Sequence, residues 1–134
     1  MSEQAGASAR YDYAGLDRVI HEKARLGVMT SLYSAADGLA FGDLKSLCAL
    51  TDGNLSRHLA TLETAGLVTM EKGYRGRRPH TQVLLTPEGR SQFEAYVAEL
   101  ERVVKDAARA KPSRSGARRG HPKPSGSGSR LKPA

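Results

Sequence analysis

The residues with the clearest chemistry form a short run of arginines past the middle of the chain. Arg75, Arg77 and Arg78 fill three of four consecutive positions, and Lys72 precedes them with no acidic residue between. A guanidinium binds a phosphate through two parallel N–H groups. A loop needs fewer charges than this to stay in solution. The run therefore indicates contact with a polyanion, along a phosphate backbone or in the minor groove of a duplex.

A second polar set lies in the stretch Thr51–Gly66. Leu55, Leu59 and Leu62 recur at helical spacing, so one face of this segment is apolar. The opposite face carries small or short polar side chains around a single guanidinium, Arg57. Such a face suits a helix that enters the major groove, where short donors and acceptors reach base edges. An ordinary amphipathic helix has the same apolar spacing, so this segment alone leaves both interpretations open.

Hydrophobic periodicity predicts the elements that position these two sets. Apolar spacing indicates one broken helix or two consecutive helices over 16–35, and a single strand pairing is open for 39–41. A short helix over 42–49 precedes a helix over 52–65 that Thr51 caps, and two such helices joined by a tight turn form a helix-turn-helix. The core face of the first of them should carry Phe41, Leu44, Leu47 and Cys48. We expect Cys48 to act as a small buried hydrophobe.

Two β-prone runs, 67–72 and 80–85, flank the arginine-containing stretch 73–79. This arrangement predicts a hairpin whose tip is a seven-residue loop holding the arginines. His58, upstream, lies between the apolar and outer faces of its helix, where we expect packing and a phosphate contact and no base readout.

Thr86 and Pro87 then start a helix that should run over 87–109, with apolar residues every three or four positions. It would span about 34 Å at ~1.5 Å per residue, more than a domain of about 95 residues needs for one face. The second half of its apolar stripe therefore predicts a homodimer formed through this helix. The alternative, packing against the 16–35 segment of the same chain, accounts for only part of the stripe.

The net charge of +7 comes from the end of the chain. Residues 111–134 hold seven basic and no acidic side chains, so the preceding residues are neutral overall. Proline, glycine and serine are frequent there, and we expect this basic tail to be disordered. It would attract a polyanion without sequence preference, or serve only as a solubilising tail.

Several classes of function are not indicated. A single cysteine, Cys48, and four dispersed histidines give no metal-ligand set, and no cofactor motif, nucleophile–base pair or carboxylate pair indicates an enzyme. No apolar run is long enough for a membrane span, and no signal-peptide pattern is present. We therefore expect a cytoplasmic protein without membrane, metal or cofactor.

Taken in order, these elements resemble a winged helix-turn-helix transcriptional regulator, close to the small MarR-like and ArsR-like bacterial DNA-binding proteins. The segments 50–59, 62–68, 73–79 and 85–89 carry the resemblance, which runs from about residue 16 to 100. It implies a mainly α fold with a small β-hairpin (α+β) and a long C-terminal helix. The domain would cover 15–110, between a flexible segment 1–14 and the basic tail 111–134.

The resemblance also implies a partner and a set of contacts. The 52–65 helix would lie in the major groove of double-stranded DNA, and the 73–79 wing would lie on the backbone or in the minor groove. The implied DNA-binding residues are Asp52, Gly53, Asn54, Ser56, Arg57, Thr61, Lys72, Arg75, Arg77 and Arg78. The metal-ligand clusters of ArsR-like sensors are absent from this sequence, and a small-molecule effector is left open.

The leading interpretation is a dimeric, sequence-specific regulator of transcription. One alternative is an architectural DNA-binding protein without sequence preference, driven by the basic tail. Another is a winged helix that binds protein and no nucleic acid, although the arginine run argues against it because protein interface cores exclude charge.

Overall fold

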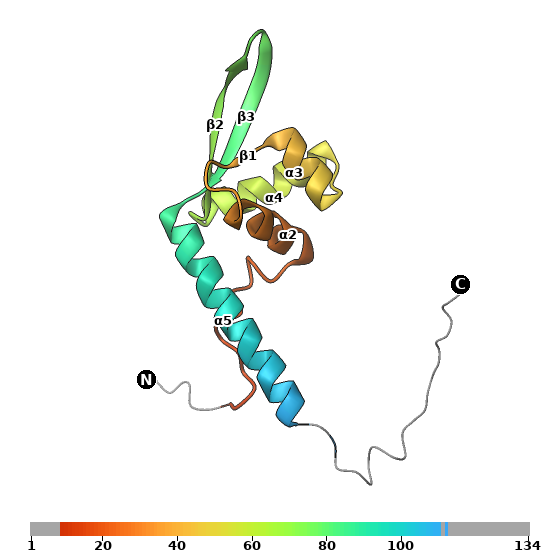
Figure 1. The fold of residues 1–134 in the computed structure, drawn as a ribbon, viewed down its shortest axis with the longest axis vertical. Helices are drawn as coiled ribbons and strands as arrows, with labels where there is room; N and C mark the ends of the chain where they lie inside the picture. The colour runs from red at the N-terminus through yellow and green to blue at the C-terminus, as the bar shows by residue number, and fades with distance from the viewer. Residues whose placement is uncertain (1–8, 111, 113–134) are drawn as a thin grey trace, which may run out of the picture. The chain divides into compact units, whose positions relative to one another are not determined.

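The computed structural model describes residues 9–110 and residue 112. The chain divides into two units, 1–101 and 102–134. The elements, in order, are α2 (Lys23–Tyr33), β1 (Leu39–Ala40), α3 (Phe41–Cys48), α4 (Asp52–Thr64), β2 (Val68–Arg75), β3 (Arg78–Leu85) and α5 (Pro87–Arg109) (Figure 1). The predicted α+β class is confirmed. The basic tail predicted to be disordered lies, apart from residue 112, outside the described residues, as does most of the predicted flexible segment 1–14.

The prediction of one broken helix or two consecutive helices over 16–35 is wrong in its first part, where no helix precedes α2 among the described residues. A carboxylate oxygen of Asp17, Oδ1, accepts hydrogen bonds from the backbone N–H groups of Val19 at 2.7 Å and Ile20 at 3.2 Å. This side chain thereby closes a single turn that does not continue as a helix. The helix α2 begins only after Glu22, whose side chain accepts from the N–H of Arg25 at 2.9 Å.

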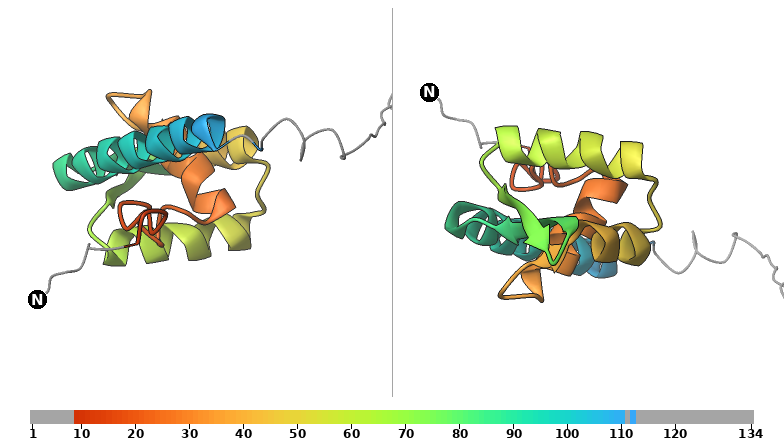
Figure 2. Two further views of the ribbon diagram at one scale, coloured as in Figure 1. Left: turned by 90° about the horizontal axis from the view of Figure 1, so that it is seen from below. Right: turned by 90° about the horizontal axis from the view of Figure 1, so that it is seen from above.

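The N-terminal segment lies between α4 and α5 (Figure 2). The backbone N–H of Gly15 donates to Glu99 Oε2 at 3.0 Å, and His21 Nδ1 lies 2.6 Å from the hydroxyl of Tyr96. Burial raises the pKa of the Tyr96 hydroxyl. These contacts join Gly15 and His21 to the middle of α5.

The hydrophobic core is formed by the helices, the sheet and the segment before α2. The three leucines predicted for the inner face of α4, Leu55, Leu59 and Leu62, are all fully buried. The other fully buried core side chains include Ile20, Val28, Met29, Leu32, Leu44 and Val83. The helix α3 differs from its prediction, because only Leu44 of its expected core face is fully buried and Leu47 is 64% exposed. Phe41 and Cys48 pack at the edge of the core.

The sheet has three antiparallel strands in the order β1-β3-β2. The strand pairing left open for 39–41 is present: Leu39 pairs with Val83, and Ala40 pairs with Gln82. The hairpin β2–β3 projects past α3 and α4 (Figure 1). Thr86 then caps α5, as predicted, by accepting from the N–H of Gly89 at 2.8 Å.

The predicted seven-residue tip of the hairpin is wrong. The strands continue until Arg75 pairs with Arg78, which leaves a turn of Gly76 and Arg77. Gly76 has a φ of +64°, at the first central position, as in a type II′ turn. Periodicity did not reveal the longer strands because their outer halves are exposed and carry no apolar alternation.

Candidate nucleic-acid interface

The helix α4 presents its polar residues on one exposed face. Thr51 caps it, since the Thr51 hydroxyl oxygen accepts from the N–H of Asn54 at 3.1 Å. The structure brings six predicted site residues together on this helix, five of them exposed and Thr61 partly buried. They are Asp52, Gly53, Asn54, Ser56, Arg57 and Thr61.

The charged groups of this face are held by local partners. Arg57 donates from Nη2 to the Asn54 side-chain oxygen at 2.8 Å, so its guanidinium has a defined orientation. Asp52 Oδ1 lies 2.7 Å from Lys45 Nζ, which joins the start of α4 to α3. A carboxylate in the first turn of a helix also interacts favourably with the helix dipole. This pairing offsets the repulsion that Asp52 would exert on a phosphate backbone.

Two polar side chains, Arg25 of α2 and Glu22 just before it, lie close to His58 of α4. His58 is buried, and Arg25 donates from Nη1 to His58 Nδ1 at 3.2 Å. Arg25 also donates from Nε to the carbonyl of Val19 at 2.7 Å. Hydrogen bonding from the N–H of Arg25 holds the pKa of the Glu22 carboxyl below its usual range. The packing role predicted for His58 is confirmed, whereas sequence reasoning missed Arg25 and Glu22.

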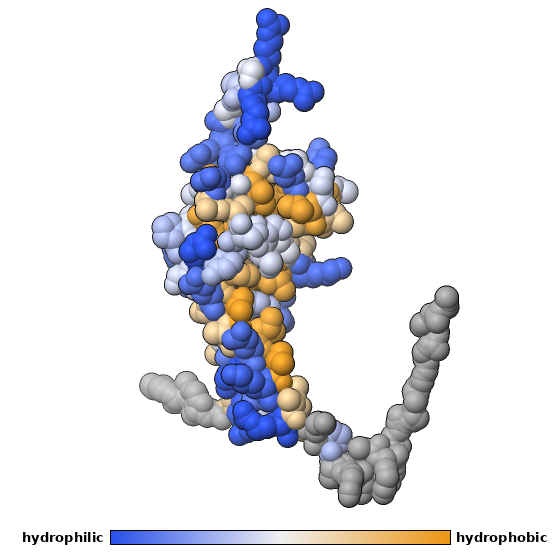
Figure 3. Space-filling model, viewed as in Figure 1, coloured by the Kyte–Doolittle hydropathy of each residue, from blue (hydrophilic) through white to orange (hydrophobic). Residues whose placement is uncertain are grey.

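The arginines of the hairpin lie at its tip and are all exposed. Arg75 and Arg78 are direct cross-strand partners, so their side chains leave the same face of the hairpin, and Arg77 occupies the turn. Like charges directly opposite each other destabilise a hairpin. Among the described residues, none of these three guanidiniums forms an ion pair with a carboxylate. The space-filling view shows this hydrophilic tip (Figure 3).

Hydrogen bonds brace the base of the same face. The Gln82 side chain donates to the carbonyl of Asp37 at 3.0 Å, and its oxygen Oε1 lies 2.8 Å from His80 Nε2. Arg75 Nη2 lies 3.4 Å from the same His80 nitrogen. Lys72, in contrast, pairs with Thr81 on the opposite face, so it is separated from Arg75.

This geometry, a capped polar helix followed by a basic hairpin, agrees with a family model. A model described as a winged helix DNA-binding domain matches residues 24–104. The chain belongs to this family. In winged helix proteins, the helix at the position of α4 is named the recognition helix and the hairpin at the position of β2–β3 is named the wing, and we use these two names below.

Two curated relatives share 32% identity with this winged helix chain. An uncharacterized protein of Methanocaldococcus jannaschii matches 66% of the chain over 96% of its own length. The uncharacterized HTH-type transcriptional regulator YdgJ of Bacillus subtilis matches 75% of the chain over 65% of its own length.

Solved structures share the winged helix fold as well. A transcriptional regulator homologue of Pyrococcus horikoshii has 30% identity and a TM-score of 0.62, covering 66% of this chain and 86% of its own. A MarR-family regulator of Silicibacter pomeroyi has 26% identity and a TM-score of 0.52, and the match covers 80% of this chain and 73% of that regulator. MepR of S. aureus, in a complex with DNA, has 18% identity and a TM-score of 0.54, and the match covers 78% of this chain and 79% of MepR. The chain thus shares the winged helix fold of known transcriptional regulators, a MarR-family member among them.

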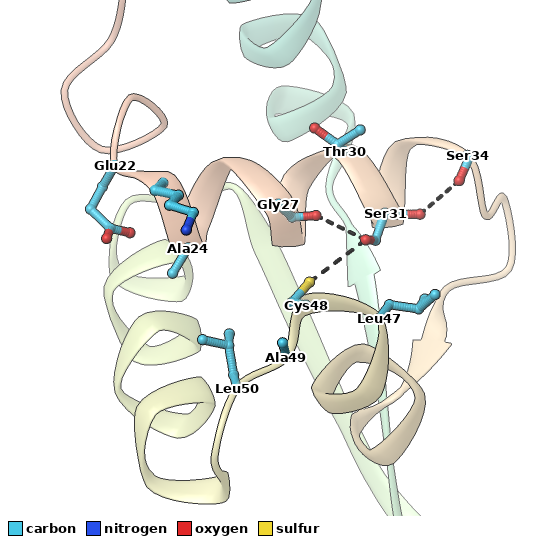
Figure 4. A pocket seen from close by; sticks show the side chains of 11 residues that line it. Glu22, Ala24, Gly27, Thr30, Ser31, Ser34, Leu47, Cys48, Ala49 and Leu50 are labelled. Carbon is cyan, nitrogen blue, oxygen red and sulfur yellow. Dashed lines mark hydrogen bonds between the residues drawn. The ribbon is translucent and has the colours of Figure 1, made fainter. Parts of the chain in front are cut away.

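A groove outside the recognition helix was not predicted. It lies between α2 and the end of α3, has a volume of about 640 Å³, and is lined by Leu47 and Cys48 among others (Figure 4). The Ser31 hydroxyl donates to the carbonyl of Gly27 at 2.8 Å and lies 3.7 Å from the Cys48 sulfur. Cys48 is half-buried there and was expected to be buried.

The described residues contain no group of three or more histidine, cysteine, aspartate or glutamate side chains able to hold a metal ion. Across the same residues, no helix has the length and apolar character needed to cross a membrane.

Proposed function

We propose that this winged helix protein is a sequence-specific regulator that binds double-stranded DNA as a homodimer in the cytoplasm. The observation that carries the proposal is the outer face of α4, where Asn54 holds the single guanidinium of Arg57 in place. The arginine-rich wing, on the same unit of the chain, supplies the charge that such a helix needs beside it.

In this proposal α4 lies in the major groove. Apart from Arg57 and Glu63, its exposed side chains are short, which allows the helix backbone to approach the base edges closely. Arginine binding to guanine O6 and N7 is the commonest specific contact in this groove. Arg57 would read one guanine in each half-site, and Asp52, Gly53, Asn54, Ser56 and Thr61 would contact neighbouring bases or phosphates.

The wing would bind the phosphate backbone or enter the minor groove beside that site. Arg75, Arg77 and Arg78 are exposed and lack carboxylate partners among the described residues, so phosphates would relieve the repulsion between them. Lys72 would join them only from the opposite face. MepR, which shares this fold, has been solved as a complex with DNA, and this supports DNA binding by the fold.

The long helix α5 supports the homodimer. Val104 is 63% exposed, although it belongs to the apolar stripe of this helix, and Figure 3 shows apolar side chains along one side of α5. A second copy would cover this stripe. Two recognition helices related by a two-fold axis would read half-sites about 34 Å apart, one turn of duplex DNA.

Selection of bound sequences from a random duplex pool tests the proposal. We expect the selected sequences to contain an inverted repeat whose half-sites are spaced by about 10 base pairs or a multiple of this. Selection of no common sequence by a chain that binds DNA would favour the architectural role of the basic tail. Failure to bind any duplex at low salt would contradict DNA binding itself.

A further inference from the structure

The two faces of the wing differ in chemistry. Direct cross-strand partners share a face, so Arg75 and Arg78 lie on one face of the hairpin, and Tyr74 and Pro79 lie on the other. At the base of the hairpin, the face of Tyr74 is the one that carries Val83 into the core. The wing therefore has one face that carries Arg75 and Arg78, and an opposite face that carries Tyr74 and Pro79 beside Lys72.

Tyr74 is the most exposed large apolar side chain of the described residues, at 75%. Its ring forms no hydrogen bond or ring contact with another described residue. Pro79, opposite it, lacks a backbone N–H and adds a second flat apolar surface. Such a ring on an isolated hairpin tip contributes nothing to the core, so a contact outside the chain is the role that its position allows.

The neighbouring charges identify the kind of surface that would cover this ring. Three exposed guanidiniums surround the tip, which suits a polyanion and opposes an apolar protein surface. The minor groove of DNA is about 6 Å wide. Its walls are built from deoxyribose, and proteins that enter it frequently use apolar side chains together with arginine.

We propose that Tyr74 and Pro79 form an apolar edge of the wing that packs against deoxyribose in the minor groove. The arginines of the other face bind phosphates at the same time. The inference rests on the proposed DNA binding and adds a contact residue, Tyr74, whose contribution to affinity depends on the width of the groove. Sites with a narrow minor groove beside the half-site would be preferred, because both walls then reach the wing.

A fluorescent substitution tests the position of the ring directly. The chain contains no tryptophan, so Tyr74→Trp introduces a single reporter into the full-length protein. Acrylamide should quench this reporter readily in the free protein and several-fold less on a saturating duplex. Equal quenching in the free and DNA-bound protein, with binding verified by the anisotropy of labelled DNA, would overturn the proposal.

The energetic test compares variants of the same ring. Tyr74→Ala should weaken binding about tenfold, from the loss of buried apolar area, without changing the salt dependence because no charge is removed. Tyr74→Phe should bind like the natural protein. Tyr11→Ala, which removes another exposed tyrosine, should have no effect.

Failure of this inference is distinguishable from failure of the proposed function. If the natural protein binds DNA and Tyr74→Ala binds equally well, only the apolar contact is wrong. A lower salt slope for Tyr74→Ala would also contradict it, because that result would indicate disturbed arginines. Absence of binding by the natural protein to every duplex would overturn both proposals.

Discussion

The recognition helix and the wing both present guanidinium groups to solvent, but they differ in how those groups are held. On α4, Arg57 donates to Asn54, and Asp52 pairs with Lys45, so each charged group has a defined geometry before any ligand arrives. On the wing, the two cross-strand arginines face each other without a carboxylate among the described residues.

In the proposed complex with DNA, this difference would give the two regions different roles. A guanidinium with a fixed orientation can discriminate between base edges, because a misplaced donor loses a hydrogen bond in a desolvated groove. Closely spaced and unpaired cations attract phosphates of any sequence. We therefore propose that α4 provides specificity and that the wing provides general affinity.

The largest expected effect on DNA binding comes from a substitution on α4. Arg57→Ala should cost about 1–3 kcal/mol on the selected site and relax the preference at one base position. Binding to unrelated duplexes should change much less. Competition titrations against specific and scrambled DNA measure both quantities, and Arg18→Ala serves as a control that removes an exposed arginine elsewhere. An unchanged preference in the folded variant would contradict the assignment of α4.

The wing should respond differently. Arg77→Ala should weaken binding to all duplexes alike and lower the slope of log affinity against log salt by about 1. The reason is that one fewer counterion is released from the phosphates. A salt series on the same two duplexes measures the slope. If Arg77→Ala changed the preferred sequence and left the slope intact, the division between helix and wing would be wrong.

A smaller effect, of opposite sign, should appear in stability. Arg78→Thr removes one of two like charges that face each other across the hairpin, and threonine favours strands. We expect the free energy of unfolding to rise by about 0.2–1 kcal/mol while DNA binding weakens. Urea denaturation measures the first change. Arg77→Thr is the matched control, because Arg77 lies in the turn without a cross-strand partner.

The smallest effect concerns acid stability. The pKa of Glu22 is lowered from 4.5, so its stabilising contribution is fully present above that value and is lost as the pH falls through the lowered pKa. Glu22→Gln should remove this part of the acid dependence, because the amide keeps a capping oxygen but carries no charge. Thermal melts between about pH 3 and pH 6 would detect the difference. Identical pH profiles would show that Glu22 does not contribute.

Much of this organisation could be predicted from the sequence because it depends on local signals. Thr51 and Gly66 at the two ends of α4 mark it by capping chemistry, and Gly66 has the expected positive φ of +81°. The apolar spacing of its leucines identifies the inner face and, by difference, the outer one. The winged helix family could be predicted from the order of such elements.

The features that were not predicted depend on contacts between distant residues. Lys45 reaches Asp52 only because the α3–α4 turn includes Ala49 with a φ of +55°, which the sequence does not indicate. Arg25 meets His58 across 33 positions of the chain. The side chain of Asp17 closes a single turn where apolar spacing alone predicted the first part of a broken helix or of two consecutive helices.

The central claim, that Arg57 reads the major groove, is tested most directly at a single atom of the DNA. Replacing the guanine of each selected half-site by 7-deazaguanine removes the N7 acceptor and leaves the minor groove unchanged. We predict that 7-deazaguanine lowers the affinity of the natural protein and of Arg77→Ala by the same factor. The affinity of Arg57→Ala should be the same for the guanine and the 7-deazaguanine duplex, because this variant has already lost the contact. Equal losses in all three proteins, or none in the natural protein at any guanine, would contradict it.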